Sequence, residues 1–233
     1  MGIPLTQRQL DAFRRYLAGL TEWNQRFNLT SPNALADAQR VHFLDSLVVV
    51  PVVKRDQPKG SSLIDVGSGA GFPGLVVKLV MPELRVVLLE ATRKKAEFLR
   101  WMANDLGLVG VEVVAERAEE AGRHADLRES FDVVTARAVG PLPVVLEFGL
   151  PLCKVGGSLI ASRGGEGLHQ AQEAFGVAAK LGGTMKGAER VDVEGVAERT
   201  VLVVVDKTAP TPGEYPRRTG IPSKRPLTGS RSH

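Results

Sequence analysis

Cysteine is almost absent from this sequence, in which Cys153 is the only one among 233 residues. A single cysteine excludes an intramolecular disulfide and a cysteine zinc site, and it fits a reducing cytosol. The four histidines show no H-E-x-x-H or other metal-binding spacing, so we expect no metal centre. The sequence also lacks an apolar run of about 18 residues and a secretory signal. We therefore expect a cytoplasmic protein without a membrane partner.

Composition and length are otherwise ordinary. Hydrophobic residues make up 43% of the chain and charged residues 24%, which is typical of a soluble globular protein. A chain of 233 residues is long enough for one α/β domain with an appendage. The net charge of +4 is compatible with a polyanionic partner such as nucleic acid, without requiring one. We expect a monomer, although the sequence leaves the oligomeric state open.

Two helices are predicted in the first 60 residues. Thr6 followed by Gln9 forms a capping box, and apolar residues recur behind it at three- and four-residue steps. A serine-proline pair then restarts a helix that is predicted to span about 31–47. We interpret residues 1–60 as a helical extension that packs on the domain after it.

Beyond the extension, short aliphatic strands alternate with helices, and this domain covers 61–207. The alternation predicts an α/β fold, a Rossmann-like and mostly parallel sheet with helices on both faces and ligands at the carboxyl ends of the strands. The clearest helix spans 93–107. A last strand at 201–206 is expected to run antiparallel, in a closing hairpin with 183–193. The other predicted strands are 62–66, 84–90, 111–115, 131–136 and 156–162.

A glycine-rich turn follows the first strand, where residues 65–74 read Asp-Val-Gly-Ser-Gly-Ala-Gly-Phe-Pro-Gly. Glycines permit positive φ and let backbone N–H groups approach a ligand, and Pro73 suits the first turn of the next helix. Glu90, at the tip of the second strand, suits a ribose diol. Together these features predict a site for a nucleotide-derived cofactor. The plainer alternative is a glycine turn that only packs a helix on a sheet.

The chemical class of that cofactor depends on one carboxylate. Gly69, Gly71 and Gly74 satisfy the G-x-G-x-x-G spacing of dinucleotide sites, so a nicotinamide-dependent dehydrogenase is an alternative. Asp65, however, stands beside the turn, where a pyrophosphate would meet the helix N-terminus and be repelled. S-adenosyl-L-methionine has no phosphate and carries a positive amino group and a positive sulfonium. We therefore expect S-adenosyl-L-methionine as the cofactor.

Basic residues and prolines dominate the last segment, residues 208–233, which we call the C-terminal arm. Its prolines discourage helix and strand. One interpretation is a solvated, frayed terminus. The other is a basic arm that folds back beside the cofactor crevice and meets phosphates. The basic residues are Arg217, Arg218, Lys224, Arg225 and Arg231.

Several segments, which together cover nearly the whole chain, resemble a known family. They are 27–30, 42–47, 65–74, 88–90, 93–95, 98–100, 117–119, 136–138 and 215–222, with Lys224 and Pro226-Leu227. On these segments the chain resembles the bacterial 16S ribosomal RNA guanine-N7 methyltransferases, also called glucose-inhibited division protein B. The glycine turn is shared with many methyltransferases, whereas 42–47 and 215–227 are particular to this family.

The resemblance implies a class I methyltransferase fold with a seven-stranded sheet. It also implies methyl transfer from S-adenosyl-L-methionine to N7 of a guanine, with 16S rRNA or the small-subunit ribosomal particle as the partner. N7 carries an exposed lone pair on the major-groove edge of the base, so its methylation requires no general base. A non-catalytic RNA-binding assembly factor that keeps the cofactor pocket is a further alternative.

The resemblance also implies roles for individual residues. Gly67 and Phe72 would line the methionine and ribose part of the cofactor, and Ala118 and Glu119 would meet the adenine. Arg137 would close the site near the transferring methyl group, as the catalytic residue. The other cofactor-binding residues expected are Asp65, Ser68, Gly69, Gly71 and Glu90. The RNA-binding residues expected are Arg163, which stands where the family usually has lysine, and Arg217, Arg218, Lys224 and Arg225.

Arg137 and a further candidate residue, His42, each have a plainer alternative. Arg137 could simply pair with a surface carboxylate, but its position at the end of the fourth strand favours a role in the site. His42 could be a partly buried helix residue. With Asp45 and Ser46 close behind it, we favour a polar cluster that covers the cofactor crevice over a catalytic histidine.

Overall fold

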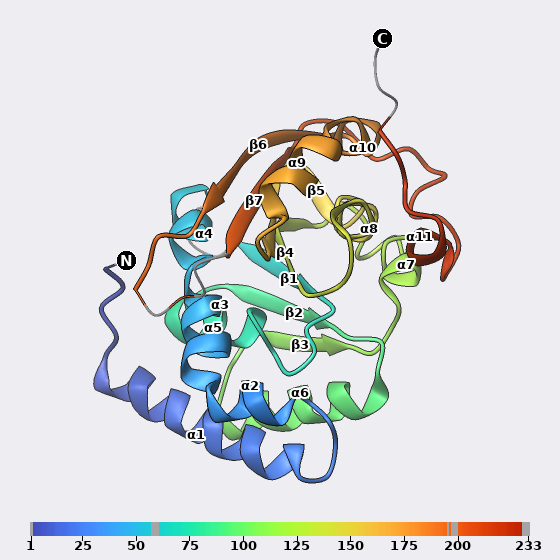
Figure 1. The fold of residues 1–233 in the computed structure, drawn as a ribbon. Coiled ribbons are helices and arrows are strands. Elements are labelled where there is room, and N and C mark those ends of the chain that lie inside the picture. Colours follow the sequence, from blue (N-terminus) through green and yellow to red (C-terminus); the bar gives the residue numbers. More distant parts are fainter. Residues whose placement is uncertain (1, 57–60, 195, 197–199, 230–233) are drawn as a thin grey trace.

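The structure is a computed structural model that describes residues 2–56, 61–194, 196 and 200–229. Helix α1 (Gln7–Asn24) packs against α6 and lies along the lower edge of the molecule in Figure 1. Its predicted capping box is confirmed. The Thr6 side chain accepts a hydrogen bond from the Gln9 backbone N–H, and the Gln9 side chain accepts one from the Thr6 N–H.

The single helix predicted for residues 31–47 is wrong. This part of the chain, which we call the cap segment, is broken into three pieces. Asp37 ends the first piece with φ of −112°, and its carboxylate accepts a hydrogen bond from the Arg40 side chain. A π-helical turn follows, a rare conformation that is frequent at functional sites. The pieces are α2 (Pro32–Ala36), the π-helix η1 (Gln39–Leu44) and α3 (Asp45–Leu47), and α4 (Val50–Asp56) follows them.

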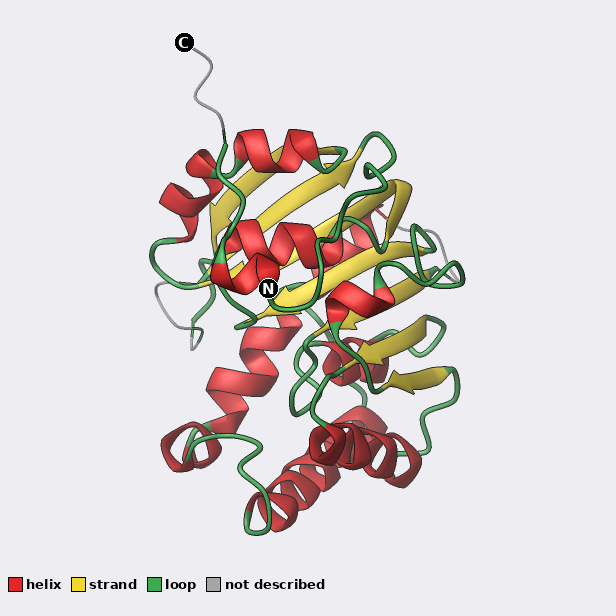
Figure 2. Ribbon diagram, turned by 90° about the vertical axis from the view of Figure 1, so that its right-hand side faces the viewer, coloured by secondary structure: helices red, strands yellow, loops and turns green. Residues whose placement is uncertain are grey.

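A seven-stranded sheet forms the centre of the molecule, with the strand order β3-β2-β1-β4-β5-β7-β6. Strands β1 to β5 are parallel, and β7 runs antiparallel to both β5 and β6, as the closing hairpin predicted. Figure 2 shows the twisted sheet between its helices. The strands are β1 (Ser62–Val66), β2 (Arg85–Leu89), β3 (Val111–Val114), β4 (Phe131–Arg137), β5 (Cys153–Arg163), β6 (Gly183–Arg190) and β7 (Val201–Lys207).

Helices cover both faces of the sheet, because alternate residues of a strand point to opposite faces. In β1, Leu63 packs in the hydrophobic cluster with α1, α5 and α6, whereas Ile64 packs in the cluster with α8 and α10. Burial on both faces explains why the strands read as continuous aliphatic runs. The remaining helices are α5 (Gly74–Val80), α6 (Arg93–Asp105), α7 (Ala118–Ala121), α8 (Leu142–Gly149), α9 (Gly167–Glu173), α10 (Phe175–Lys180) and α11 (Ile221–Lys224).

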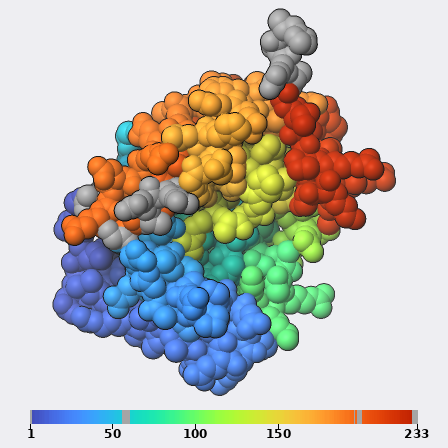
Figure 3. Space-filling view, in the orientation of Figure 1, coloured from blue at the N-terminus to red at the C-terminus, as the bar shows by residue number. Residues whose placement is uncertain are grey.

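The chain after β7 packs on the domain. The buried Lys207 ammonium pairs with Glu129 at 2.8 Å, and the same carboxylate accepts the Thr211 backbone N–H at 2.7 Å. The Arg128 side chain donates hydrogen bonds to the carbonyl oxygens of Thr211 and Tyr215. The first part of the C-terminal arm therefore belongs to the folded surface, where Figure 3 shows it in red. None of the helices in the described part of the chain is long and apolar enough to cross a membrane.

Candidate active site

The glycine turn lies between β1 and α5, and its glycines serve different purposes. Gly67 and Gly69 have φ of +68° and +58°, a left-handed conformation that strongly favours glycine. A Cβ at Gly69 would meet only the Gly67 carbonyl oxygen, at 3.8 Å, so the turn leaves a cradle open there. A Cβ at Gly71 would lie 2.3 Å from Tyr16 Oη, and one at Gly74 would lie 2.5 Å from a Leu88 methyl group. A Cβ at Gly67 would lie 2.9 Å from a Val139 methyl group. Gly69 therefore leaves room for a ligand, whereas Gly67, Gly71 and Gly74 permit close packing.

Asp65 is completely buried beneath this turn. Its Oδ2 accepts the Gly74 backbone N–H at 3.1 Å and its Oδ1 accepts the Thr135 hydroxyl at 2.8 Å, while Ser68 Oγ donates to the Asp65 carbonyl oxygen. Burial raises the pKa of Asp65 to about 6, and the hydrogen bonds from Thr135 and Gly74 oppose that rise. The carboxylate therefore carries a negative charge at neutral pH, but its oxygens face protein donors. A direct contact between Asp65 and the cofactor stays a prediction. Without such a contact, the negative charge of Asp65 would act on a ligand through space.

Glu90 follows β2 and links two loops. Its Oε2 accepts the Gly69 backbone N–H at 2.9 Å, and its Oε1 accepts the Thr92 N–H at 2.7 Å. The residue is 7% exposed. Each carboxylate oxygen can accept a second hydrogen bond, so Glu90 can take the two hydroxyls of a ribose.

The predicted adenine contacts lie in α7, beside the C-terminal arm. Glu119 is buried, and its Oε1 accepts the Gly220 backbone N–H at 2.8 Å. Thr219 Oγ1 donates to Glu120 at 3.2 Å. The arm therefore forms a wall next to Ala118 and Glu119, on the same edge of the sheet as the glycine turn.

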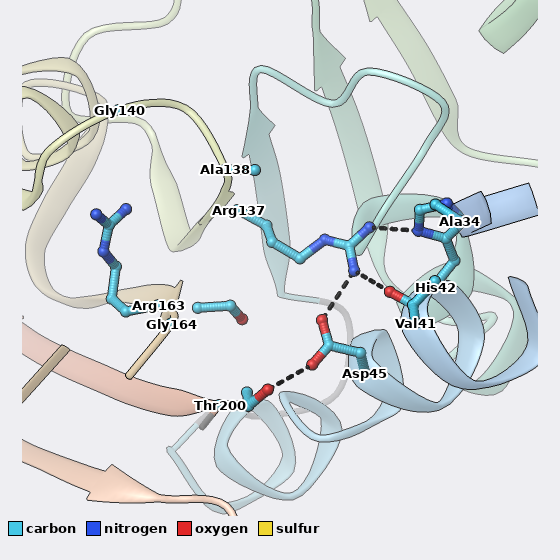
Figure 4. Close-up of a pocket in the computed structure, with 11 residues that line it drawn as sticks. Ala34, Val41, His42, Asp45, Arg137, Ala138, Gly140, Arg163, Gly164 and Thr200 are labelled. Carbon is cyan, nitrogen blue, oxygen red and sulfur yellow. Dashed lines mark hydrogen bonds and ion pairs between the residues drawn. The ribbon is translucent and has the colours of Figure 1, made fainter. Parts of the chain in front are cut away.

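Arg137 is the last residue of β4, and the cap segment holds its guanidinium (Figure 4). Nη1 donates to Asp45 Oδ2 at 2.8 Å and to the Val41 carbonyl oxygen at 3.0 Å, and the guanidinium carbon lies 5.4 Å from the centre of the Phe72 ring. The ion pair is mostly buried, with side chains 16% and 15% exposed. The plainer alternative was that Arg137 pairs with a surface carboxylate. Arg137 does pair with a carboxylate, but this pair is mostly buried and lies inside the candidate site.

His42 lies between Phe72 and Arg137. Its ring stacks on Phe72 with a centroid distance of 4.6 Å. Nδ1 lies 3.3 Å from Arg137 Nη2, which can only donate, so Nδ1 is the acceptor and Nε2 donates to Thr30 Oγ1 at 2.8 Å. Burial, and then the Arg137 charge, lower the pKa of His42 to about 4. The histidine is therefore neutral at physiological pH, which suits a cap residue better than an acid catalyst.

Of the predicted RNA-binding residues, Arg163 ends β5 near Arg137, whereas the others lie on the C-terminal arm. Arg163 donates from Nε and Nη2 to Gln170 Oε1. Arg217 is bound to the buried Glu147, at 2.8 Å and 2.6 Å, so its charge is already compensated. The predicted RNA-binding residues of the arm that are exposed are Arg218, Lys224 and Arg225.

The sequence did not reveal several polar partners in this site. Thr200 Oγ1 donates to Asp45 Oδ1 at 3.0 Å across 155 positions of chain, and Tyr16 Oη donates to the Ala70 carbonyl oxygen at 2.5 Å. The Thr30 hydroxyl is hydrogen-bonded to His42, and the Thr135 hydroxyl is hydrogen-bonded to Asp65. Nothing in the local pattern marks these residues, because each partner is distant in the sequence. Among the described residues, no three His, Cys, Asp or Glu side chains gather as metal ligands, and the expected absence of a metal stays a prediction.

Comparison with known proteins gives a consistent result. The model of the family described as rRNA small subunit methyltransferase G matches residues 9–194. A protein named ribosomal RNA small subunit methyltransferase G from Roseiflexus castenholzii is 48% identical over 226 residues, which are 97% of this chain and 95% of the relative. The protein of the same name from Dehalococcoides mccartyi is 41% identical over 228 residues, again covering 97% of this chain and 95% of the relative.

Solved structures show the same fold at low identity. A precorrin-6y C5,15-methyltransferase from Geobacter metallireducens superposes with a TM-score of 0.54 and 17% identity, over 70% of this chain and 87% of that one. This likeness confirms the predicted Rossmann-like methyltransferase fold.

Proposed function

The chain belongs to the rRNA small subunit methyltransferase G family, and we propose on that premise that it transfers a methyl group from S-adenosyl-L-methionine to N7 of a guanine in 16S ribosomal RNA. One observation of the structure supports this function most. The open glycine cradle, Glu90 and Arg137 lie together at the carboxyl ends of β1, β2 and β4. In open α/β sheets, ligands bind at this edge.

The residues at this edge fit S-adenosyl-L-methionine. The cradle at Gly69 leaves space against bare backbone, and Glu90 has capacity to accept both ribose hydroxyls. Asp65 places a buried negative charge next to the turn, which suits a cationic ligand. We assign Gly67 and Phe72 to the methionine and ribose part and Ala118 and Glu119 to the adenine, as the family resemblance implies.

Methylation of N7 needs positioning rather than proton transfer. When bound, the cofactor supplies an electrophilic methyl group on a sulfonium sulfur. Because the N7 lone pair is unprotonated, the chain has only to hold the two reactants in line, and orientation of this kind is worth roughly 7 to 11 kcal/mol of a barrier. We propose that Arg137, held by Asp45 and Val41, fixes one side of the reacting centre and excludes water from it.

The exposed basic side chains of the C-terminal arm support RNA as the substrate. Arg218, Lys224 and Arg225 lie beside α7 and α8, next to the adenine side of the site. Lysine and arginine contacts to phosphates give RNA affinity that falls with salt. Because the modified base must be unstacked, we infer that the substrate presents the guanine in a loop, in free 16S RNA or in a small-subunit particle.

Mass spectrometry of nucleosides tests the function directly. Free 16S RNA and small-subunit particles are each incubated with the protein and S-adenosyl-L-methionine, and 7-methylguanosine is quantified. We expect the nucleoside to appear with at least one of the two substrates. No new methylated nucleoside with either substrate would reject the proposal, and this result with retained RNA and cofactor binding would indicate the non-catalytic assembly factor.

Arg137→Ala tests the catalytic assignment. We expect kcat to fall on the order of a hundredfold, since misplacing a reactant by about 1 Å has an effect of that size. Arg14→Ala is the matched control, because Arg14 lies on the surface of α1, where its side chain is 70% exposed. Equal kcat values in the two variants would remove Arg137 from the reaction.

Family membership does not favour the nicotinamide-dependent dehydrogenase. Isothermal titration separates the two cofactors, and we expect heat of binding with S-adenosyl-L-methionine and none with NAD. We infer that the protein acts in the cytoplasm, where ribosomal RNA is modified, and the monomeric state stays a prediction that sedimentation would check.

A further inference from the structure

Helix α1 reaches the glycine turn through one side chain. Tyr16 is completely buried, and its hydroxyl donates to the Ala70 carbonyl oxygen at 2.5 Å. Ala70 lies in the middle of the turn, between Gly69 and Gly71. Burial raises the pKa of Tyr16 well above its ordinary value, so the hydroxyl keeps its proton and stays a donor. In the described part of the chain, Tyr16 is the only hydrogen-bond donor to this carbonyl oxygen.

The turn needs such a contact, because its own backbone is permissive. Gly67, Gly69 and Gly71 all have positive φ, and glycine loses more conformational freedom on folding than any other residue. A Cβ at Gly71 would lie 2.3 Å from Tyr16 Oη, so glycine at this position allows the hydroxyl to approach the turn. Gly71 and the buried tyrosine are therefore complementary in shape.

The Tyr16 ring makes a second contact with the turn. It stacks on Phe72 with a centroid distance of 5.2 Å and an angle of 6° between the ring planes. The His42 ring also stacks on Phe72, and the Arg137 guanidinium carbon lies 5.4 Å from the centre of the Phe72 ring. Arg137 in turn lines a cavity of about 590 Å³ between the cap segment and the ends of β4 and β5. Tyr16 therefore supports the side chain that both His42 and Arg137 contact.

We propose that Tyr16 is a positioning residue for methyl transfer, which holds the glycine turn and Phe72 in the conformation that binds S-adenosyl-L-methionine. The inference rests on the proposed function, and it assigns part of the cofactor affinity to the N-terminal extension. Without the hydroxyl, the turn populates other backbone conformations, and the apparent dissociation constant for the cofactor rises as the competent fraction falls. Without the ring, Phe72 loses a stacking partner, and Arg137 loses part of its support.

Two variants of Tyr16 separate the hydroxyl from the ring. Tyr16→Phe removes only the hydroxyl, so the dissociation constant for S-adenosyl-L-methionine should rise about fivefold, the effect of one ordinary hydrogen bond on an equilibrium. Its kcat at saturating cofactor should stay within about twofold of the wild type, because the stack on Phe72 is kept. Tyr16→Leu removes both groups, and its kcat should fall about tenfold or more. Tyr16→Phe decides the proposal by itself if Tyr16→Leu does not fold.

Trp23→Leu is the matched control. Trp23 lies on the same helix and packs against the same hydrophobic cluster, but its ring contacts Phe27, Phe98 and Trp101, which lie outside the turn and the cap segment. This variant should lower the free energy of unfolding without changing cofactor affinity or kcat. Isothermal titration measures the dissociation constant, methylation of 16S RNA at saturating cofactor gives kcat, and urea unfolding gives the stability.

A merely structural role for Tyr16 would lower the stability and leave cofactor affinity unchanged. Equal dissociation constants for the wild type and Tyr16→Phe would therefore overturn the proposal, as would a rise of the same size in Trp23→Leu. An unchanged kcat in a folded Tyr16→Leu would overturn the role of the ring. Because the titration needs no RNA, a wild type that binds the cofactor but transfers no methyl group would reject the proposed function, while the ratio of dissociation constants would still decide the role of Tyr16.

Discussion

Removal of the Arg217 guanidinium should destabilise the protein far more than removal of a surface charge. Glu147, in α8, is completely buried. Its Oε1 accepts hydrogen bonds from the Arg217 backbone N–H at 2.9 Å and from Nε at 2.8 Å, and its Oε2 accepts one from Nη2 at 2.6 Å. Hydrogen bonding to Glu147 raises the pKa of Arg217. This bidentate pair attaches the C-terminal arm to the core.

The expected magnitude follows from the burial of the carboxylate. Arg217→Met keeps most of the side-chain volume and leaves Glu147 buried with only the backbone N–H as a donor. Removing one partner of a buried ion pair costs about 3 to 5 kcal/mol, because the remaining charge is uncompensated. An exposed ion pair contributes only about 0 to 1 kcal/mol. The double variant Glu147→Leu with Arg217→Met should recover much of the loss, since it removes the buried charge as well.

Urea unfolding followed by circular dichroism measures the free energy of unfolding. Arg218→Met is the control, because this exposed neighbour has no side-chain hydrogen bond or ion pair among the described residues. We expect its effect on stability to stay within about 0.5 kcal/mol. The reasoning fails if Arg217→Met is as stable as Arg218→Met, or if the double variant is less stable than the single one.

The same two variants separate anchoring from RNA contact. If Arg218 meets a phosphate, Arg218→Met should lower the slope of log K against log salt by roughly one. Arg217→Met, measured where it remains folded, should change the slope less, because Glu147 already holds its guanidinium. A larger change in this slope for Arg217→Met than for Arg218→Met would indicate that Arg217 binds RNA phosphates, and would contradict our description of it as an anchor.

Three further predictions concern the cap segment and the glycine turn. Asp45→Asn removes the charge that holds Arg137, so the single-turnover rate constant for methyl transfer should fall about tenfold or more. An unchanged rate constant would contradict the role of Asp45 in holding Arg137. The pKa of His42 is lowered from 6.5 to about 4, so the unfolded chain binds the proton first, and the free energy of unfolding should decrease as pH falls from about 6.5 to about 4. The raised pKa of Asp65 makes the free energy of unfolding change with pH in the opposite direction below pH 6. The wild type is therefore compared with His42→Gln, in which Asp65 is kept. Identical profiles of stability against pH in the two proteins would refute the prediction. Tyr16→Phe leaves the buried Ala70 carbonyl oxygen without the hydroxyl that donates to it at 2.5 Å. The free energy of unfolding, measured in urea, should therefore fall by about 1 to 3 kcal/mol. An unchanged free energy of unfolding would show that this hydrogen bond does not stabilise the protein.

Local patterns determined most of the secondary structure and the location of the cofactor turn. The Thr6–Gln9 capping box, the aliphatic strands and the glycine turn depend on neighbours within a few positions, so composition and periodicity reveal them. The parallel order of the strands follows from their alternation with helices, which in turn places Glu90 and Arg137 at one edge. The break in the cap segment escaped prediction, because a π-helical turn has no strong local signature.

Only the tertiary structure decided which side chains meet in the site. Arg137 and Asp45 are separated by 92 positions, and Gly220 and Glu119 by 101. The turn predicted that Asp65 lies beside the cofactor site, but not that both its oxygens face protein donors. A residue type and its spacing specify what a side chain can bind, whereas its actual partner depends on how crossovers bring distant segments together. The sequence by itself thus determined most of the elements and the cofactor class, and the packing of those elements decided the cavity beside Arg137 and the anchor of the C-terminal arm.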